Sequence, residues 1–469
     1  MAAPASSLRR AHADAETVPF WLDRSDAPAP HPPLTGPTTA DLVIVGAGFT
    51  GLWAAIQAKQ DDPDRDVLVL EGDTISFGAS GRNGGFCDAT LTHGLENGIA
   101  RFPDEIETIE RLAADNFEGI EATVRRFGIE CDWVDSGEVA VATEPHQVGW
   151  MREGVELEQR YGYDARFLDQ EQVRAELDSP RYLAGLWKRS GCAIVDPARL
   201  AWGLARVAGT LGVRFHERTP ATGIGLVGAG VRVSTAAGDV TARRAILATN
   251  AFRPLVRSIR RYVVPVYDHV LMTEPLTAAQ RASIGWERRQ GFADATNRFH
   301  YFRTSEDGRI LFGGYDAVYH WRNGVDPRFE QWEPTFDKLA GHFYGMFPQL
   351  EDIRFSHRWG GVIDTCSRFS VMFGRALEDR VSYAVGYTGM GVAATRFGAR
   401  VALDLVDGLD TERTRLRLVS SKPVPFPPEP LRWIGVKFTE HEMERADHNA
   451  GERGLWLKAL DALGLGFDS

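Results

Sequence analysis

Three scarcities narrow the class of protein. No apolar run approaches the roughly 18 residues that a membrane span needs, since the longest, residues 42–49, contains three small residues. Basic residues number 53 against 64 acidic ones, and the net charge of −11 without a separate basic cluster argues against nucleic acid as a partner. Four cysteines stand far apart without a CxxC pair. We therefore expect neither a metal site nor a dithiol motif, and we favour a reducing, cytoplasmic location.

What is present is the composition of an ordinary globular protein. The chain has 469 residues, of which 43% are apolar and 25% charged, and this length predicts two to three domains. The first 40 residues hold seven of the 24 prolines and include Arg9-Arg10, but the apolar segment of a twin-arginine signal does not follow. We interpret residues 1–40 as an extended arm over the surface.

The folded part begins with a glycine fingerprint. Residues 42–45 are apolar and mostly β-branched, as in a strand buried on both faces. Gly46, Gly48 and Gly51 follow in a GxGxxG pattern, and residues 52–60 are good helix formers. A strand, a glycine turn and a helix in this order predict a dinucleotide site, where the turn lets the backbone approach a pyrophosphate at the helix N-terminus.

A second strand supplies the matching acidic residue. Residues 66–70 are predicted to be a strand, and Glu71 follows it twenty residues after Gly51. A carboxylate there can accept both ribose hydroxyls, and it would repel the 2′-phosphate of NADP. FAD and NAD share this fingerprint, so another feature has to separate them.

That feature is the glycine-rich stretch of residues 76–86, which cannot be a helix interior. Its sequence ASGRNGG, residues 79–85, resembles the loop that runs under the flavin in the D-amino-acid-oxidase and glycine-oxidase superfamily, and more narrowly the gamma-glutamylputrescine oxidase branch. The resemblance continues in residues 213–222, in 245–251, in Trp359-Gly360-Gly361 with Thr365, and in 385–395. It implies FAD as the cofactor.

The last of these motifs also has a direct physical interpretation. Gly389 and Gly391 stand at a predicted turn from a strand into a helix over residues 392–405, so backbone amides can approach a planar ligand closely. A helix N-terminus aimed at the flavin would stabilise the negative charge of its reduced form. The fingerprint and the resemblance together assign these residues to FAD: Gly46, Gly48, Phe49, Thr50, Gly51, Glu71, Gly72, Ser80, Arg82, Asn83, Gly84, Gly85, Ala221, Thr249, Asn250, Thr388, Gly389, Met390, Gly391 and Val392.

The distribution of these motifs predicts an α/β protein with two interleaved domains. A Rossmann-like FAD-binding domain would comprise residues 41–100, 190–262 and 357–421. An α+β substrate domain with an antiparallel sheet would comprise 101–189 and 263–356, where helical periodicity over 101–127 and β-rich runs occur. The proline-rich stretch 422–430 begins a C-terminal extension, 422–469, which we expect to pack on the body.

The resemblance implies oxidation of a carbon–nitrogen bond in an amine, with hydride transfer from the α-carbon to flavin N5 and hydrolysis of the imine. Arginines on one β-rich segment, Arg298 and Arg303, favour a polar primary or secondary amine or amino acid with a polar or anionic tail. The residues expected to line the substrate site are Tyr267, His300, Arg303, Tyr315 and Trp359. Each of them also has a purely structural interpretation, as aromatic packing, a structural histidine or an exposed arginine.

Two other functions stay open at this point. One is a flavoenzyme of another class, such as a 2-hydroxy-acid oxidase or a tRNA-modifying protein, although the acidic charge argues against tRNA. The other is a flavin-binding protein without catalytic activity.

We expect FAD to be bound without a covalent link. Asn83 stands where some relatives carry a linking histidine, and their linking cysteine would fall near Gly360, six residues before Cys366. Some relatives also activate oxygen with a lysine on a substrate-domain strand. Here Leu311 is nearest to its place and no lysine lies between residues 263 and 318, so we expect either oxygen or an unidentified carrier as the electron acceptor, with slow reaction with oxygen.

Overall fold

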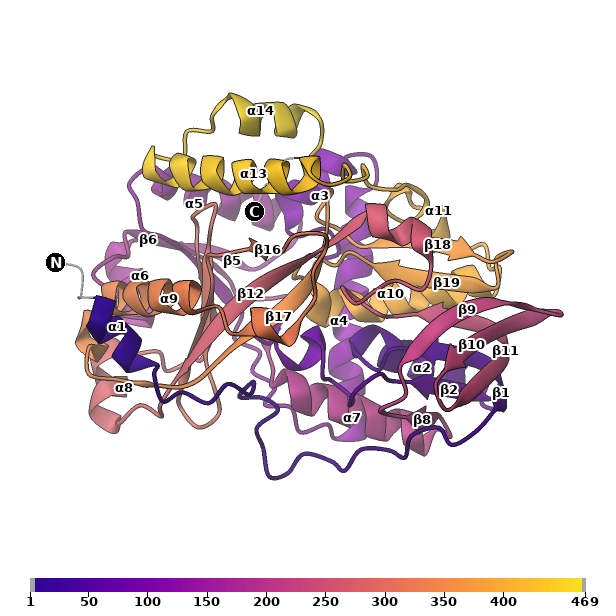
Figure 1. Ribbon diagram of the computed structural model, residues 1–469. Helices are drawn as coiled ribbons and strands as arrows, with labels where there is room; N and C mark the ends of the chain where they lie inside the picture. The colour runs from indigo at the N-terminus through magenta and orange to yellow at the C-terminus, as the bar shows by residue number, and fades with distance from the viewer. Residues whose placement is uncertain (1–4, 466–469) are drawn as a thin grey trace.

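The computed structural model describes residues 5–465 and contains two large sheets, one on each side of the molecule in Figure 1. Residues 1–4 of the predicted arm and 466–469 of the predicted extension lie outside this range. Among residues 5–465, no helix combines the length and the apolar character that crossing a membrane requires.

The first sheet is built around a buried parallel core. Strand β1 begins at Thr38 and its last four residues are buried, as their β-branched sequence predicts. Five strands are parallel, in the order β19-β11-β1-β2-β8, and β18 and the hairpin β9–β10 pair antiparallel to them. The eight strands are β1 (Thr38–Val45), β2 (Val67–Leu70), β8 (Arg214–His216), β9 (Ala221–Val227), β10 (Gly230–Thr235), β11 (Gly238–Leu247), β18 (Met372–Ala376) and β19 (Val381–Val385).

Four helices cover one face of this sheet and bury the largest apolar core. They are α2 (Phe49–Asp61), α4 (Ile106–Phe127), α7 (Pro197–Thr210) and α10 (Gly391–Val406). Helix α2 is buried along most of its length because it lies between α7 and α10. Helix α4, which the sequence assigned to the substrate domain, packs against α10 with Phe117 and Ile120 in this same core.

The second sheet is largely antiparallel, in the order β16-β12-β15-β14-β13-β4-β6-β5, with β17 also paired to β12. Its strands are β4 (Glu138–Ala142), β5 (Ala165–Leu168), β6 (Ala184–Lys188), β12 (Val263–Thr273), β13 (Gly291–Asp294), β14 (His300–Thr304), β15 (Ile310–Gly314), β16 (Val318–Tyr319) and β17 (Phe355–Cys366). Its helices are α5 (Gln147–Arg160), α6 (Gln170–Glu176), α8 (Ala278–Ile284) and α9 (Glu333–Met346). The predicted α/β class, with a parallel domain and an interleaved domain containing an antiparallel sheet, is confirmed.

One boundary differs from the sequence prediction. Residues 357–366 were assigned to the FAD-binding domain, but they belong to β17, whose full length pairs with β12 in the nine-stranded sheet. A ladder of this length outweighs the local likeness of the segment to a strand of the first sheet. Strand β17 therefore brings the second sheet up to the turn between β19 and α10.

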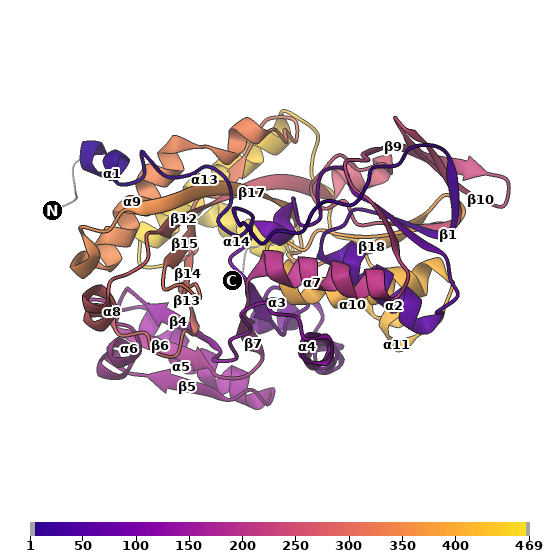
Figure 2. The same ribbon diagram turned by 90° about the horizontal axis from the view of Figure 1, so that it is seen from below.

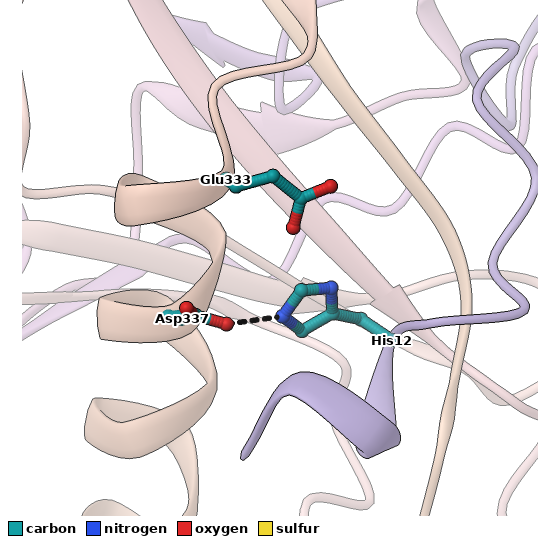
Figure 3. Close-up of side chains that lie close together, drawn as sticks. All are labelled: His12, Glu333 and Asp337. Carbon is teal, nitrogen blue, oxygen red and sulfur yellow. Dashed lines mark hydrogen bonds and ion pairs between the residues drawn. The ribbon is translucent and has the colours of Figure 1, made fainter. Parts of the chain in front are cut away.

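The N-terminal arm is not entirely extended, because it begins with helix α1 (Ala5–Ala11), and it then runs across both halves of the molecule to β1 (Figure 2). His12 attaches the arm to α9 through a 3.0 Å contact between Nε2 and Asp337 (Figure 3). Glu333 lies beside them, and Arg358 contacts both Glu333 and the His12 Nδ1 atom. This cluster of possible metal ligands therefore already contains a cation.

The C-terminal extension crosses the top of the molecule in Figure 1 as two antiparallel helices. After the short helices α11 (Glu412–Arg415) and α12 (Arg417–Ser420), a proline-rich segment leads into α13 (Leu431–His448) and α14 (Leu455–Ala462). We refer to residues 431–465 as the C-terminal hairpin. The expectation that it packs on the body agrees with its contacts, described below.

Candidate functional site

A cavity of about 960 Å³ lies where the loops of the first sheet face the strands of the second. Its volume is at the upper end of the range for small-molecule sites. It is lined by the α2 N-terminus, the loop after β2, the turn between β19 and α10, strands β12, β14 and β17, and the C-terminal hairpin. Fourteen of the predicted FAD-binding residues lie on its wall: Gly48, Phe49, Thr50, Ser80, Arg82, Asn83, Gly84, Gly85, Asn250, Thr388, Gly389, Met390, Gly391 and Val392.

The glycine fingerprint forms one end of this cavity. Gly46 has φ +107°, and a Cβ atom on Gly51 would lie 1.9 Å from the Gly46 carbonyl oxygen, so the turn and α2 pack too closely for any side chain. The first turn of α2 contains no acidic residue, and its N–H groups have no intrahelical acceptor. This helix end is suited to hold a pyrophosphate.

The loop after β2 is held in place by its own polar groups. The Ser80 hydroxyl accepts the Phe49 N–H at 2.9 Å, which joins the loop to the start of α2. The Asn83 amide donates to the Ala79 carbonyl at 2.8 Å and accepts the Gly85 N–H at 2.8 Å. Its side chain thus shapes the cavity wall, and the backbone of the loop lies along the cavity.

The turn between β19 and α10 is fixed by a buried carboxylate on β17. Asp364 accepts the N–H groups of Gly386 at 2.5 Å and Tyr387 at 3.1 Å, and its carbonyl accepts the Thr388 N–H. Burial raises the pKa of Asp364 to about 7, although the bonded N–H groups oppose the rise. Thr388 adopts φ +54°, a strained conformation for a β-branched residue. These contacts keep the helix N-terminus directed at the cavity.

Six predicted FAD residues lie outside the cavity wall, because they shape turns behind it or lie further along the sheet edge. They are Gly46, Gly51, Glu71, Gly72, Ala221 and Thr249. The Glu71 carboxylate accepts the N–H groups of Ala47 at 2.7 Å and Asp73 at 3.0 Å, and burial raises its pKa. It therefore holds the glycine turn and keeps lone pairs for a ribose. The predicted FAD residues together fit this cofactor. The N-terminus of α2 offers a site for its phosphates, and the N-terminus of α10 also faces the cavity.

The cavity wall beside the glycine-rich loop carries a pair of residues that the sequence did not predict. Tyr301 on β14 donates its hydroxyl hydrogen to the carboxylate of Asp268 on β12, and Asp268 also accepts the His269 N–H at 2.9 Å. Burial raises the pKa of Asp268 to about 6. The Tyr301 ring packs against the loop so closely that a Cβ atom on Gly84 would lie 2.7 Å from it.

Tyr315 is the one predicted substrate-site residue that lines the cavity, within the described part of the chain. Tyr267 does not, because residues alternate along β12 and place Asp268 inward and Tyr267 on the opposite face. There the Tyr267 hydroxyl donates to the Asp326 carbonyl at 3.2 Å. The signal that could have identified Asp268 is this alternation, with Val264 and Val266 on the same wall.

The other three predicted substrate contacts are corrected by the structure. His300 lies on the face of β14 opposite Tyr301, with Nδ1 2.5 Å from Asp294 and Nε2 2.8 Å from His342. Arg303 is fully buried under Trp21 of the N-terminal arm, where burial lowers its pKa to about 10. Trp359 is fully buried and donates to the Arg82 carbonyl at 2.9 Å. None of the three lines the cavity.

Arg298, the remaining arginine behind the expectation of an anionic tail, does line the cavity. Its guanidinium is already bonded to Asp316 and lies 3.3 Å from Glu444. The charge of Arg298 is therefore neutralised. Neither Arg298 nor the buried Arg303 supports an anionic substrate tail.

Another part of the cavity wall carries carboxyl groups. Asp88 and Glu138 line it, and Lys188 bonds Asp88 at 2.8 Å behind the wall. Burial raises the pKa of Glu138 to about 7. Burial alone would lower the pKa of Lys188, but Asp88, Glu158 and Glu138 outweigh it and raise that pKa. Cys192, Asp88 and Glu138 lie close enough together to be possible metal ligands. Lys188 already supplies a positive charge to the two carboxylates of this group.

Comparison with known proteins gives consistent likenesses. The sequence profile of the FAD-dependent oxidoreductases (DAO) matches residues 41–405. The chain is 32% identical over 410 residues to gamma-glutamylputrescine oxidoreductase of Escherichia coli (strain K12), covering 85% of this chain and 90% of that protein. It is 28% identical over 405 residues to the probable oxidoreductase OrdL of Haemophilus influenzae, covering 84% and 89%. In fold it is similar to glycine oxidase from Geobacillus kaustophilus, with a TM-score of 0.65 at 17% identity over 80% of this chain and 96% of that one.

Proposed function

The chain belongs to the family of FAD-dependent oxidoreductases, and from this membership we propose that it oxidises the carbon–nitrogen bond of a polar primary or secondary amine or amino acid. The similarity to gamma-glutamylputrescine oxidoreductase supports an amine over a 2-hydroxy acid. A catalytically inactive flavin-binding protein is the alternative that the experiment below must exclude.

The observation that carries this proposal is the Asp268–Tyr301 pair on the cavity wall. A partly buried carboxylate beside the glycine-rich loop offers an acceptor for the N–H groups of an amine. An ammonium substrate has to lose a proton before its α-carbon can lose a hydride, and Asp268 can hold that proton at its carboxylate. Tyr301 orients the carboxylate by donating to one of its oxygens.

When bound, FAD supplies the two-electron acceptor for the hydride that leaves the amine α-carbon, and water hydrolyses the resulting imine. Residues at the α2 N-terminus would hold the pyrophosphate, and the loop of residues 79–85 would lie along the cofactor. The N–H groups in the first turn of α10, which follows the turn that Asp364 fixes, would stabilise negative charge in the cavity. We propose that FAD is bound non-covalently, and that the electron acceptor is oxygen or a cellular carrier.

Anaerobic titration of the holoprotein tests this function. Panels of primary amines, secondary amines, amino acids and 2-hydroxy acids are mixed with the yellow enzyme, and the flavin absorbance near 450 nm is followed. We expect amines or amino acids to bleach it, and Asp268→Asn to slow the bleaching by about 10²-fold or more. Bleaching by hydroxy acids alone, or by none of the compounds, would overturn the proposal.

A further inference from the structure

The C-terminal hairpin forms part of the cavity wall, although it lies beyond residue 405, where the match to the family ends. Both helices of the hairpin contribute residues to the cavity wall. In Figure 1, α14 lies above α13 at the top of the molecule. The hairpin residues on the wall are predominantly apolar: Leu431, Ile434, Gly435, Val436, Met443, Trp456, Leu457, Ala459, Leu460, Leu463 and Leu465, with Arg432, Thr439, Glu440 and Arg453.

Both ends of α13 are anchored to the second sheet. At its C-terminal end, Asp447 accepts the Asn297 N–H at 2.8 Å and the Arg298 N–H at 3.2 Å. At its N-terminal end, Tyr319 donates to Glu429 at 2.5 Å, and Arg432 donates to Asn323 at 2.6 Å. The middle of the helix therefore spans the cavity between two fixed points.

The polar groups of this wall are paired with protein partners. The Thr439 hydroxyl accepts the Trp456 Nε1–H at 2.9 Å, and Lys437 bonds Glu440 at 2.8 Å. Arg453 lies 3.0 Å from Asp461. What this wall offers a ligand is therefore hydrocarbon surface.

The same surface continues to the opening of the cavity. Four large apolar side chains both line the cavity and are strongly exposed, at 49% for Val424, 62% for Leu431, 53% for Ile434 and 67% for Leu463. Residues that share these two properties mark the entrance. The entrance is thus apolar, while Asp268, which lines the same cavity, is less exposed than these four side chains.

We propose that the C-terminal hairpin binds an unbranched hydrocarbon segment of the substrate, next to the amine group that is oxidised. The proposal rests on the proposed amine oxidation and adds a specificity determinant outside the region that matches the family. A methylene chain leaves no polar group unpaired against this wall, and each methylene removed from water strengthens binding by roughly three- to fourfold. The hairpin thereby selects amines by chain length.

The experiment uses linear primary amines from propylamine to decylamine with the FAD-loaded full chain. Stopped-flow reduction of the flavin under anaerobic conditions gives the apparent affinity and the limiting rate for each amine. For the wild-type chain we expect the affinity to rise by roughly three- to fourfold per methylene. It should reach a plateau when the alkyl chain covers the whole apolar wall of the C-terminal hairpin. The limiting rate should change little, because the reacting end stays the same.

Ile434→Glu is the test variant, because this exposed side chain can be replaced without opening a core. We expect it to weaken octylamine about tenfold more than propylamine. Leu455→Glu is the matched control, since Leu455 belongs to the same hairpin, is 88% exposed and does not line the cavity. It should keep the wild-type dependence on chain length. Flavin content verifies that each variant is folded.

The outcomes separate the two proposals. If no amine or amino acid reduces the flavin, the proposed function fails. If amino acids or short amines reduce the flavin while chain length has no effect, or while alkylamines of every length are inert, the hairpin proposal is overturned. Either result leaves the proposed amine oxidation standing. Equal behaviour of Ile434→Glu and Leu455→Glu would also overturn the hairpin proposal.

Discussion

The carboxylate of Asp364 accepts the backbone N–H of Tyr387 at 3.1 Å, and this bond ties the second sheet to the first at the cavity wall. Asp364 belongs to β17 of the nine-stranded sheet, whereas Tyr387 lies in the connection from β19 to α10. The geometry of a helix N-terminus on one side of the cavity therefore depends on a side chain from the other.

Replacement of Asp364 by alanine should weaken FAD binding. The variant loses the acceptor for two buried N–H groups, and hydrogen bonds to a charged group contribute about 1.5–3 kcal/mol each. We expect the dissociation constant of FAD to rise at least tenfold, measured by fluorescence titration of the apoprotein. Asp364→Asn, which keeps one acceptor, should be intermediate. If Asp364→Ala binds FAD as tightly as the wild-type chain, the turn does not depend on this carboxylate.

Amine oxidation should depend on pH through Asp268. Burial raises the pKa of this carboxyl to about 6, so it is protonated below that pH and ionised above it. If it has to accept the amine proton, the rate of flavin reduction at saturating amine should rise with pH through about 6. Asp268→Asn should remove this limb of the profile. A variant that is slow but keeps the same limb would assign the titration to another group.

The local motifs could be predicted from the sequence because adjacent residues determine them. The apolar run ending at Val45, the glycine turn and helix α2 form one continuous segment, and the helical periodicity after Gly391 matches α10. In each case the propensity and the spacing of a few residues agree with the packing.

The substrate wall could not be predicted in this way, because it depends on which strands pair. Asp268 and Tyr301 are 33 positions apart in the sequence. They meet because the strand order β12-β15-β14 places their strands only one strand apart in the sheet. Alternation along β14 separates Arg303 from Phe302, yet it does not reveal that Trp21 of the N-terminal arm covers Arg303. The C-terminal hairpin was expected to pack on the body, but nothing in its sequence identified the cavity as its neighbour.

Glu71 should be required for retention of the cofactor. Its carboxylate holds the Ala47 N–H of the glycine turn, and two charge-assisted bonds to a ribose would add on the order of 3 kcal/mol. We expect Glu71→Ala to emerge from gel filtration largely without flavin, judged by the ratio of absorbance at 450 and 280 nm. Glu71→Gln should retain more. Full occupancy of the alanine variant at micromolar protein would disprove the ribose assignment.

FAD should separate from the protein on acid precipitation, leaving a colourless pellet. Asn83 is bonded to the Ala79 carbonyl and has no nucleophilic atom. Cys366 needs direct examination because it lines the cavity, although its thiol donates to the Ser370 carbonyl at 3.0 Å. Cys366→Ser should therefore give the same colourless pellet. Flavin that stays in the wild-type pellet and is released by Cys366→Ser would contradict non-covalent binding.

Reoxidation of the reduced enzyme by oxygen should be slow. A fixed positive charge over the flavin promotes this reaction by stabilising the superoxide that forms in the first electron transfer. Within residues 5–465 no lysine lines the cavity, and Leu311, at the position nearest to that of the activating lysine in some relatives, is fully buried beside Trp359. Arg298 does reach the wall, but Asp316 neutralises its charge. We therefore expect a dye or a cellular carrier to accept electrons faster than oxygen does. Anaerobic reduction followed by stopped-flow mixing with aerated buffer measures the rate, and reoxidation within tens of milliseconds would show that this chain activates oxygen without a lysine.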